Sequence, residues 1–593
     1  MFHYCEKIFK LLAVHLAVVG LAFAQSASLS PDLASVNGSS NVNVIVRFKH
    51  QPSDADHQRI LQLTKGGALL NKLQSVKGGA YRVPAAALAQ IAADPGVAYV
   101  SPDRKVSGKL DLTAAAINAS VAWNSGFDGS GIGVAVVDSG VAATGVADLY
   151  NASGTFRVVY EQDFTGGGPQ DQYGHGTHVA GIIAGNAKWS TCSECTRSFR
   201  GIAPNANLLD LRVLDANGES TDSTVIEAID TAISLKARYN IRVINLSLGR
   251  PVFESYTQDP LCQAVEAAWQ AGIVVVAAAG NDGRDNSFDN SGYGTIGSPG
   301  NDPYVITVGA MKAEGTPQRS DDLIASYSSK GPTSVDFFVK PDIVAPGNLV
   351  VSMLAQGTTL PSDYPSDLVA LSYYMRNGDA TPSGHYFSLS GTSMATAAVS
   401  GAVADLLEAE PNLTPDQVKA KLMKTAYKTF PATSTAVDPV TGQTYVDQYD
   451  AFTVGAGYLD MQAALADASL PVGSAMSPVA TWDPVSGNAY LTPAASSVWG
   501  STPDYSLQYV WGNTVLPGSN ALWGSQDEPW GVPLSASQSV WGNQYVWGNQ
   551  SIWGNQSVWG NQYVWGNQYV WGNQSVWGNG SPQATNILTM GEQ

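Results

Sequence analysis

The chain has 593 residues, more than one ordinary domain holds, so the sequence predicts one large unit accompanied by smaller segments. Charged residues make up only 13% of it and the formal net charge is −18, which excludes a nucleic-acid partner because phosphate contacts need clustered lysine and arginine. Lysine plus arginine outnumber aspartate plus glutamate 10 to 5 in residues 25–109, but are outnumbered 19 to 38 in residues 110–469. This unevenness is either accidental or the sign of a basic domain that docks on an acidic body.

The first residues carry the features of a secretory signal peptide. Lys7 and Lys10 precede an apolar run over residues 11–22 and a small-residue cleavage pattern that ends at Ala24. A retained membrane anchor is the alternative, but the run is shorter than the roughly 20 apolar residues that span a bilayer. We therefore expect residues 1–24 to be removed and the protein to be secreted, to the medium or the cell surface.

Residues 42–107 have the pattern of a small α+β domain. Apolar alternation predicts three strands and two helices: strands over 42–48, 79–83 and 97–100, and helices over 54–63 and 85–93. An exposed connector over residues 104–114 follows a Ser-Pro-Asp turn signal.

The pattern then changes to buried strands that alternate with helices. Continuous apolar runs predict strands over 131–137, 207–214, 241–246, 273–279 and 304–308, with helices over 222–239 and 261–271 between them. This order predicts an α/β fold with a mostly parallel sheet and helices on both faces. We assign this unit to residues 110–469.

A repetitive tail is expected over residues 470–593, which contain no lysine or arginine. The hexapeptide Trp-Gly-Asn-Gln-(Tyr/Ser)-(Val/Ile) recurs from about residue 540 to 579, and degenerate copies surround Trp499, Trp511 and Trp523. An even period keeps each residue type on one face of a strand, so stacked β structure is one interpretation and a flexible low-complexity tail is the other. The tail's tryptophans suit contact with glycan or a cell surface.

The most informative stretch for chemistry is the small-residue turn that carries Ser393, just before a predicted helix over 396–408. A serine at a helix start is often only an N-cap, but it is also the setting of a nucleophile on a tight turn. Three upstream motifs favour the nucleophile: Asp138 after a buried strand, His175 at the mouth of a helix, and Asn281 at the end of another strand. Of the other histidines in this unit, we expect His178 to be structural and His385 to lie in a surface loop.

Together these motifs resemble the subtilisin-like serine proteases, the subtilases, over roughly residues 42–468. Asp138, His175 and Ser393 follow the Asp, His, Ser order of that family. The resemblance implies that Asp138 orients His175, which takes the proton from Ser393. It also implies that Asn281 and the backbone N–H of Ser393 stabilise the oxyanion.

The family resemblance further implies a broad endopeptidase that acts on proteins or peptides through an acyl-enzyme and needs no cofactor for the chemistry. The expected enzyme prefers substrates with a large apolar residue before the cleaved bond. The substrate would bind along one edge and over one pocket floor, formed by Ser247, Leu248 and Gly249 and by Ala278, Ala279 and Gly280. The alternative is an inactive subtilase-like scaffold that binds or adheres through its tail. An esterase of another fold is excluded because its motif order differs.

The resemblance also covers residues 25–109, which are similar to the propeptide that assists folding of the enzyme and inhibits it. We expect self-cleavage between residues 103 and 112. One departure is Ala397, where the family usually has proline; alanine is a good helix former, so the helix should persist.

A structural calcium ion is a family habit, and Asp148 resembles a position that can supply a ligand. However, the neighbouring loop carries Cys192 and Cys195, which are close enough to form a disulfide in an exported protein; a zinc site would need a fourth ligand. We expect this small loop to replace part of the calcium site.

Overall fold

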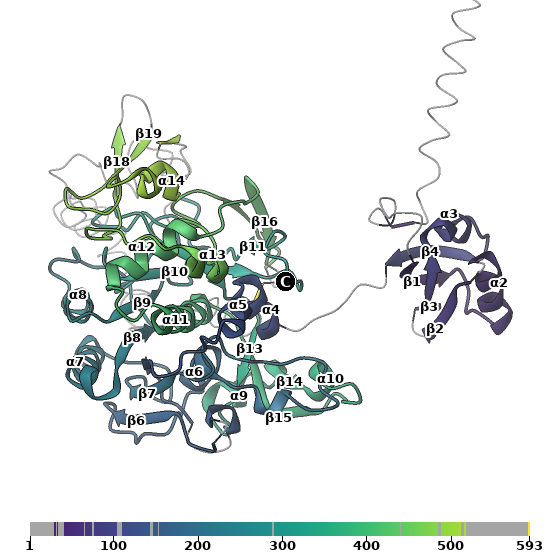
Figure 1. Ribbon diagram of the computed structural model, residues 1–593, viewed down its shortest axis with the longest axis horizontal. Coiled ribbons are helices and arrows are strands. Elements are labelled where there is room, and N and C mark those ends of the chain that lie inside the picture. Colours follow the sequence, from purple (N-terminus) through teal and green to yellow (C-terminus); the bar gives the residue numbers. More distant parts are fainter. Residues whose placement is uncertain are drawn as a thin grey trace, which may run out of the picture. The chain divides into compact units, whose positions relative to one another are not determined.

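The computed structural model describes residues 29–30, 33, 41–64, 66–73, 76–102, 109–142, 146–151, 153–286, 290–438, 441–483, 488–511, 515–517 and 591–592. The chain divides into two compact units, Met1–Val106 and Ser107–Gln593, whose elements are labelled in Figure 1. The predicted signal peptide and the hexapeptide repeats lie outside the described residues. In the part that is described, no helix is long and apolar enough to cross a membrane.

The smaller unit is an α+β module on a four-stranded antiparallel sheet, in the order β2-β3-β1-β4. Its elements are β1 (Asn41–Phe48), α2 (Asp54–Thr64), β2 (Ala68–Leu73), β3 (Gly78–Pro84), the 3-10 turn η2 (Ala85–Ala87), α3 (Leu88–Ala92) and β4 (Val97–Pro102). Alternate side chains of β1, Val44 and Val46, are buried in one core with Ile60 and Ile91 of the helices. The sequence pattern does not predict β2, because its side chains are mostly exposed and do not alternate.

The larger unit is organised around an eight-stranded sheet in the order β11-β10-β9-β8-β5-β7-β6, with β12 also paired to β10. All its pairings are parallel except β10 with β11. The strands are β5 (Gly133–Asp138), β6 (Val158–Asp163), β7 (Asn207–Arg212), β8 (Ile241–Leu246), β9 (Val274–Ala278), β10 (Ile306–Lys312), β11 (Leu323–Ile324) and β12 (Ile343–Pro346). The predicted subtilisin-like α/β fold, with a mostly parallel sheet, is confirmed.

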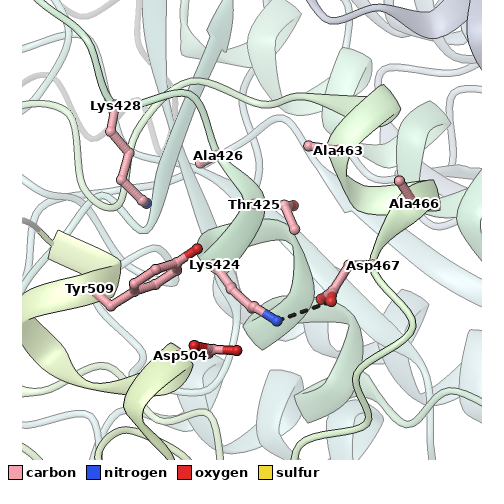
Figure 2. A pocket seen from close by; sticks show the side chains of 9 residues that line it. All are labelled: Lys424, Thr425, Ala426, Lys428, Ala463, Ala466, Asp467, Asp504 and Tyr509. Carbon is pink, nitrogen blue, oxygen red and sulfur yellow. Dashed lines mark hydrogen bonds and ion pairs between the residues drawn. The ribbon is translucent and has the colours of Figure 1, made fainter.

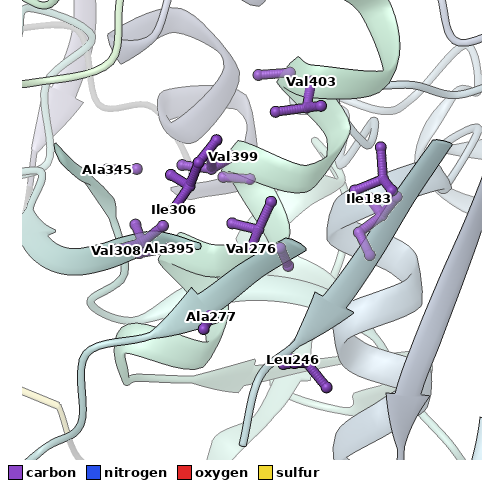
Figure 3. Packing of buried hydrophobic residues seen from close by; sticks show 14 of the residues in the cluster. Ile183, Leu246, Val276, Ala277, Ile306, Val308, Ala345, Ala395, Val399 and Val403 are labelled. Atoms are coloured by element: carbon purple, nitrogen blue, oxygen red, sulfur yellow. The ribbon is translucent and has the colours of Figure 1, made fainter. Parts of the chain in front are cut away.

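Two pairs of helices cover this sheet. Helix α6 (His175–Ala184) packs against α11 (Thr392–Ala409), and α7 (Asp222–Tyr239) packs against α8 (Pro260–Gln270). Figure 1 shows strand β8 between α7 and α11. Figure 3 shows how α11 covers the sheet: Ala395, Val399 and Val403, spaced by one helical turn, lie in the same buried cluster as Val276 and Ile306. This packing fixes the start of α11 over the strand ends.

The remaining elements surround this core. They are α4 (Lys109–Ala116), α5 (Ala119–Asn124), η3 (Ala147–Leu149), η4 (Lys188–Ser190), β13 (Val350–Met353), α9 (Thr359–Asp363), η5 (Pro365–Asp367), β14 (Leu368–Ala370), α10 (Leu371–Tyr374), β15 (Pro382–Leu389), α12 (Pro415–Thr425), β16 (Thr433–Val437), β17 (Thr444–Gln448) and α13 (Met461–Ala466). Strands β13, β15 and β14 form a small antiparallel sheet, and β16 pairs with β17.

Described helices and strands of the larger unit continue past residue 469, into the segment that the sequence analysis assigned to the tail. This segment forms β18 (Val479–Asp483), β19 (Asn488–Thr492), the 3-10 turn η6 (Pro503–Tyr505), α14 (Leu507–Trp511) and β20 (Val515–Pro517). Leu491, Val498 and Val510 are buried in the same hydrophobic core as the sheet. The loss of lysine and arginine after residue 470 changes the surface charge of the segment, but its apolar side chains still pack inside.

Two tryptophans that resemble degenerate repeats belong to this core. Trp499 and Trp511 are buried and meet edge to face with ring centroids 4.9 Å apart. The indole N–H of Trp499 donates to the carbonyl oxygen of Met476 at 2.6 Å. These two residues are therefore part of the folded unit, whatever the later repeats do.

A polar pocket lies where this segment meets α12 and α13. Figure 2 shows the residues that line it: Lys424, Thr425, Ala426, Lys428, Ala463, Ala466, Asp467, Asp504 and Tyr509. The ammonium group of Lys428 donates to the carbonyl oxygens of Met423, Ala456 and Val510, and burial lowers the pKa of Lys428 to about 7. None of the predicted site residues lines this pocket, so its polar groups serve to hold the segment against the domain.

A buried ion cluster also joins the segment to the sheet. The Asp342 carboxylate lies 2.7 Å from Nζ of Lys340 and 3.1 Å from Nζ of Lys419, and all three side chains are fully buried. The hydroxyl of Ser477 donates to Asp342 at 2.6 Å, and the N–H of Thr307 donates to it at 2.8 Å. One carboxylate thus contacts two buried lysines, and burial lowers the pKa of Lys419 to about 7.

Replacing Asp342 by asparagine should strongly destabilise this unit. The variant removes the carboxylate that pairs with buried Lys340, and breaking a buried ion pair by removing one partner costs about 3–5 kcal/mol. We would measure the free energy of unfolding by urea denaturation, with Asp230→Asn on the exposed face of α7 as the matched control. Equal stability of the two variants would contradict the role of Asp342.

Candidate active site

The predicted functional residues gather at one edge of the central sheet. Asp138 is the last residue of β5, Ser247 follows β8, and Asn281 lies beyond the end of β9. These strands are neighbours in the order β9-β8-β5 and run parallel, so their carboxyl ends lie at the same edge. This is the edge at which open α/β sheets place their functional groups.

Asp138 and His175 are in direct contact. Nδ1 of His175, the first residue of α6, lies 2.8 Å from Oδ1 of Asp138, and both side chains are buried. The same oxygen accepts the N–H of Ser139 at 2.8 Å, whereas Oδ2 has no hydrogen-bond donor among the described residues. The contact holds Nδ1 against the carboxylate and leaves Nε2 as the nitrogen that can act on another group.

The surroundings of His175 favour its protonated form. Burial by itself lowers the pKa of His175, but the charge of Asp138, its hydrogen bond and the charge of Asp171 raise the pKa above its usual value. A base with a raised pKa binds a proton more strongly when one is released nearby.

Asp171 holds the loop that precedes His175, a role that the sequence analysis missed. Its carboxylate accepts the backbone N–H groups of Tyr173, Gly174 and Thr177 at 2.7–3.1 Å. It also accepts the hydroxyls of Ser139 and Thr177 at 2.9 and 2.6 Å. No local motif marks Asp171, because an aspartate in a Gly-rich loop is usually only a turn residue.

The two other histidines differ in their surroundings. His178 is buried, with Nε2 3.1 Å from the carbonyl oxygens of Val350 and Phe387, and burial lowers its pKa to about 3. It is therefore a neutral structural residue, as expected. His385 was expected in a loop, but it lies in β15 with its ring stacked on Trp189 at 3.9 Å. The sequence around His385 is polar and lacks an apolar alternation, so it did not predict strand β15.

Ser393 is the second residue of α11, which begins at residue 392, ahead of the predicted start at 396. Its hydroxyl donates to the carbonyl oxygen of Ser247 at 3.1 Å, and the Ser247 hydroxyl donates to the carbonyl oxygen of Ser393 at 2.8 Å. This reciprocal pair ties the helix start to the end of β8. Ala397 is buried within the same unbroken helix, so the chain forms the helix without proline at that position.

Asn281 contacts the residues just before Ser393. Its Oδ1 accepts the N–H and the hydroxyl of Thr392 at 2.9 and 3.2 Å, so the amide Nδ2 points the other way. A Cβ on Gly391 would lie 3.2 Å from this Nδ2, which is why the position needs glycine for close approach. The structure thus brings an amide donor beside the turn that carries Ser393.

The predicted cleft residues follow β8 and β9. Ser247 and Leu248 are buried, whereas Gly249 is half-buried and leads to Arg250, whose backbone pairs with Ser298. At the end of β9, Ala278 and Ala279 are buried and Gly280 is half-buried; its N–H donates to the Thr392 hydroxyl at 3.2 Å. Small residues thus flank the Ser393 turn on both strands.

Both carboxylate oxygens of Asp148 accept hydrogen bonds from protein groups. Its Oδ1 accepts the N–H of Trp189 at 3.0 Å, and its Oδ2 accepts the hydroxyl of Tyr386 at 2.8 Å. Burial raises the pKa of Asp148 although these hydrogen bonds lower it. No group of three or more acidic, histidine or cysteine side chains suited to a metal occurs within the described residues. Calcium binding is general in subtilases, whereas the partners of Asp148 in this structure are protein hydrogen-bond donors.

The loop beyond Asp148 carries a disulfide between Cys192 and Cys195. We predict that this closed loop and the hydrogen bonds of Asp148 stabilise the region without metal, so the melting temperature should be the same with and without a calcium chelator. Differential scanning calorimetry with excess EDTA measures this, and a large fall in the melting temperature would restore the calcium site.

Comparison with known proteins agrees with this geometry. The model of the Subtilase family matches residues 129–457. Serine protease AprX of Bacillus subtilis (strain 168) is 34% identical over 404 residues, which cover 64% of this chain and 82% of that protein. Subtilisin E of the same organism is 31% identical over 411 residues, which cover 68% of this chain and 91% of that protein. An extracellular serine proteinase of Thermus sp. (strain Rt41A) is 30% identical over 393 residues, covering 63% and 77%.

Proposed function

The chain belongs to the subtilase family and is a serine endopeptidase, and from this premise we propose that Asp138, His175 and Ser393 form its catalytic triad. The observation that carries the proposal is the 2.8 Å contact between buried Asp138 and His175, the first residue of α6, a helix that packs against the helix bearing Ser393. Hydrolysis of a protein substrate that a serine-directed inhibitor abolishes would support it. An enzyme that such an inhibitor leaves fully active would overturn it.

In the proposed reaction, the Ser393 hydroxyl turns from the carbonyl of Ser247 toward Nε2 of His175. The hydroxyl oxygen attacks the substrate carbonyl carbon while His175 accepts the proton, and Asp138 stabilises the imidazolium that results. His175 then gives the proton to the leaving amine, which leaves an acyl group on Ser393. Attack by water on this ester, with His175 again as base, releases the acid and restores the hydroxyl.

The oxyanion of the tetrahedral intermediate would be stabilised by two donors. One is Nδ2 of Asn281, because Oδ1 of that side chain is already occupied by Thr392. The other is the backbone N–H of Ser393, because the first N–H groups of a helix have no partner within the helix. The partial positive charge of the α11 N-terminus adds to this stabilisation.

Replacing Asn281 by leucine should lower kcat by about 10²–10³ with little change in KM, because it removes a donor that acts mainly in the transition state. Steady-state kinetics on a peptide substrate measures this, with Asn205→Leu in an exposed loop as the matched control. A similar kcat for both variants would mean that Asn281 only supports the Ser393 turn.

We propose that an extended peptide pairs along Ser247, Leu248 and Gly249, and that Ala278, Ala279 and Gly280 floor the primary pocket. Small residues there leave room for a large apolar or aromatic side chain before the cut. Cleavage of a peptide library would test this specificity. Strict preference for acidic residues at that position would contradict it.

We also propose that the unit within residues 25–109 is the inhibitory propeptide, since subtilases typically have one and this unit is compact with a hydrophobic core of its own. We propose likewise that residues 1–24 are removed and that the protein is secreted. For the hexapeptide repeats we propose contact with glycan or a cell surface through tryptophan. Pull-down of the protein on polysaccharide tests the last proposal.

A further inference from the structure

A glutamate near the end of the sequence is buried in the catalytic unit. Glu592 is only 3% exposed, and its Oε2 lies 3.2 Å from Nη2 of Arg284. The same oxygen accepts the N–H and the hydroxyl of Ser326, at 2.8 and 2.5 Å. The carboxylate is therefore held by one cation and two further donors, a set suited to a negatively charged side chain.

The backbone of Glu592 is also held on both sides. Nδ2 of Asn348 donates to the carbonyl oxygen of Glu592 at 2.7 Å, and the N–H of Glu592 donates to Oδ1 of Asn348 at 2.7 Å. One side-chain amide thus satisfies a peptide donor and a peptide acceptor. The site therefore binds the peptide backbone of Glu592 as well as its side chain.

The residue before the glutamate must be glycine. Gly591 has a φ of +62°, and a Cβ there would lie 2.6 Å from the Leu349 side chain and from Oγ of Ser390. A larger residue at this position would clash with Leu349 and Ser390, so its backbone could not make the contacts that the glycine allows. The pocket thus selects a Gly-Glu pair by shape, charge and backbone hydrogen bonds together.

The pocket itself is built from groups with other partners. Arg284 also donates to Asp438 at 2.9 Å and to Ser326 at 2.7 Å, and its guanidinium lies over the ring of Tyr445. Arg284 is therefore fixed in place by contacts that do not involve Glu592. The pocket is preorganised for a second carboxylate.

This pocket lies beside the turn that carries Ser393. The N–H of Leu349 donates to Oγ of Ser390 at 2.7 Å, and the N–H of Gly391 donates to the carbonyl oxygen of Gly347 at 2.8 Å. Asn348, which holds Glu592, lies between these two anchoring residues. Whatever fills the pocket therefore buttresses the segment on which the Ser393 turn rests.

We propose that Arg284, Ser326, Asn348 and Leu349 form a binding site for an acidic peptide segment with the pattern Gly-Glu, which the chain fills with its own Gly591 and Glu592. Residues 518–590 separate this pair from the folded segment that ends at Pro517. The docking is thus an intramolecular binding event between distant parts of the chain, and a peptide of the same sequence competes for the same site.

Peptide binding to the emptied pocket tests this proposal. The chain would lack residues 591–593 and carry Ser393→Ala so that the probe stays intact. The probe is a fluorescent peptide of residues 586–593, and we expect saturable binding. Peptides with Glu592→Gln or Gly591→Ala should bind at least about tenfold more weakly, because the charged hydrogen bonds or the backbone fit are lost.

Arg284→Met in the shortened chain should abolish the preference for the Glu peptide over the Gln peptide. Equal affinity of the two peptides for the shortened chain, or no binding while its circular dichroism is unchanged, would overturn the proposal. None of these outcomes depends on hydrolysis, so they are independent of the proposed triad.

If the shortened chain does not fold, the full-length Glu592→Gln variant gives a second measurement. Hydrogen exchange of the backbone amides of Glu592 and Leu349 should be at least about tenfold faster than in the unsubstituted chain, because the docked segment opens more often. Glu227→Gln, on the exposed face of α7, is the matched control. Unchanged exchange at both amides would also overturn the proposal.

Discussion

Replacing Ser393 by alanine should reduce kcat on peptide substrates by a factor on the order of 10⁶, the loss that removal of the nucleophile causes in subtilisin. The substitution removes the atom that we propose forms the acyl-enzyme, and the remaining activity would come from substrate binding and the oxyanion donors. KM should change little, because the hydroxyl makes its hydrogen bond within the protein, to the carbonyl oxygen of Ser247, and its removal affects the chemical step rather than substrate binding. Single-turnover and steady-state kinetics on one peptide substrate measure the effect.

The matched control is Ser234→Ala, the same chemical change on an exposed position of α7. It should keep full activity, which separates loss of the nucleophile from a general effect of substitution. A Ser393→Ala variant that retained more than about a thousandth of the activity would place the nucleophile elsewhere.

The same variant tests self-cleavage of the propeptide. Mass analysis should find the unsubstituted chain cut between residues 103 and 112 and the Ser393→Ala chain intact. Identical processing of both chains would show that another protease makes the cut, and it would leave the kinetic prediction untouched.

The fold could be predicted because buried parallel strands have an unusual sequence signature. Residues 133–138 and 274–278 are continuous apolar runs, and the residues that end or follow them are the functional candidates Asp138 and Asn281. Chain order and short motifs that contain glycine then indicated His175 and Ser393 as candidates. These signals are local, so a single sequence contains them.

The parts that sequence did not predict depend on contacts between distant residues. Asp171 and Ser247 support the site through hydrogen bonds whose partners cannot be read from local spacing. The segment after residue 470 looked polar and repetitive, yet Trp499 is buried in the same hydrophobic cluster as the central sheet. Composition describes what a segment can expose; it does not say what covers it.

Replacing Asp138 by asparagine should lower kcat by a factor of about 10⁴, because the carboxylate selects the working tautomer of His175 and stabilises its charged form. In the variant, an amide in place of Oδ1 can donate to Nδ1 and so move the ring proton to Nε2, where it blocks proton transfer from Ser393. The side chain keeps its size in a site that is fully buried, so the fold should be retained. Asp230→Asn is the matched control for an exposed aspartate.

The pH dependence of the residual activity provides a test that mere unfolding would not pass. The base must be neutral, so activity is lost as the pH falls through the pKa of His175. Asp138 raises this pKa, which places the acid limb of the unsubstituted enzyme above about 6.5, the usual value for histidine. Without the carboxylate, burial prevails and lowers the pKa, so the acid limb of kcat/KM should move to lower pH. An acid limb that stayed in place would mean that Asp138 does not set the protonation of His175, and a limb that moved upward would contradict the triad itself.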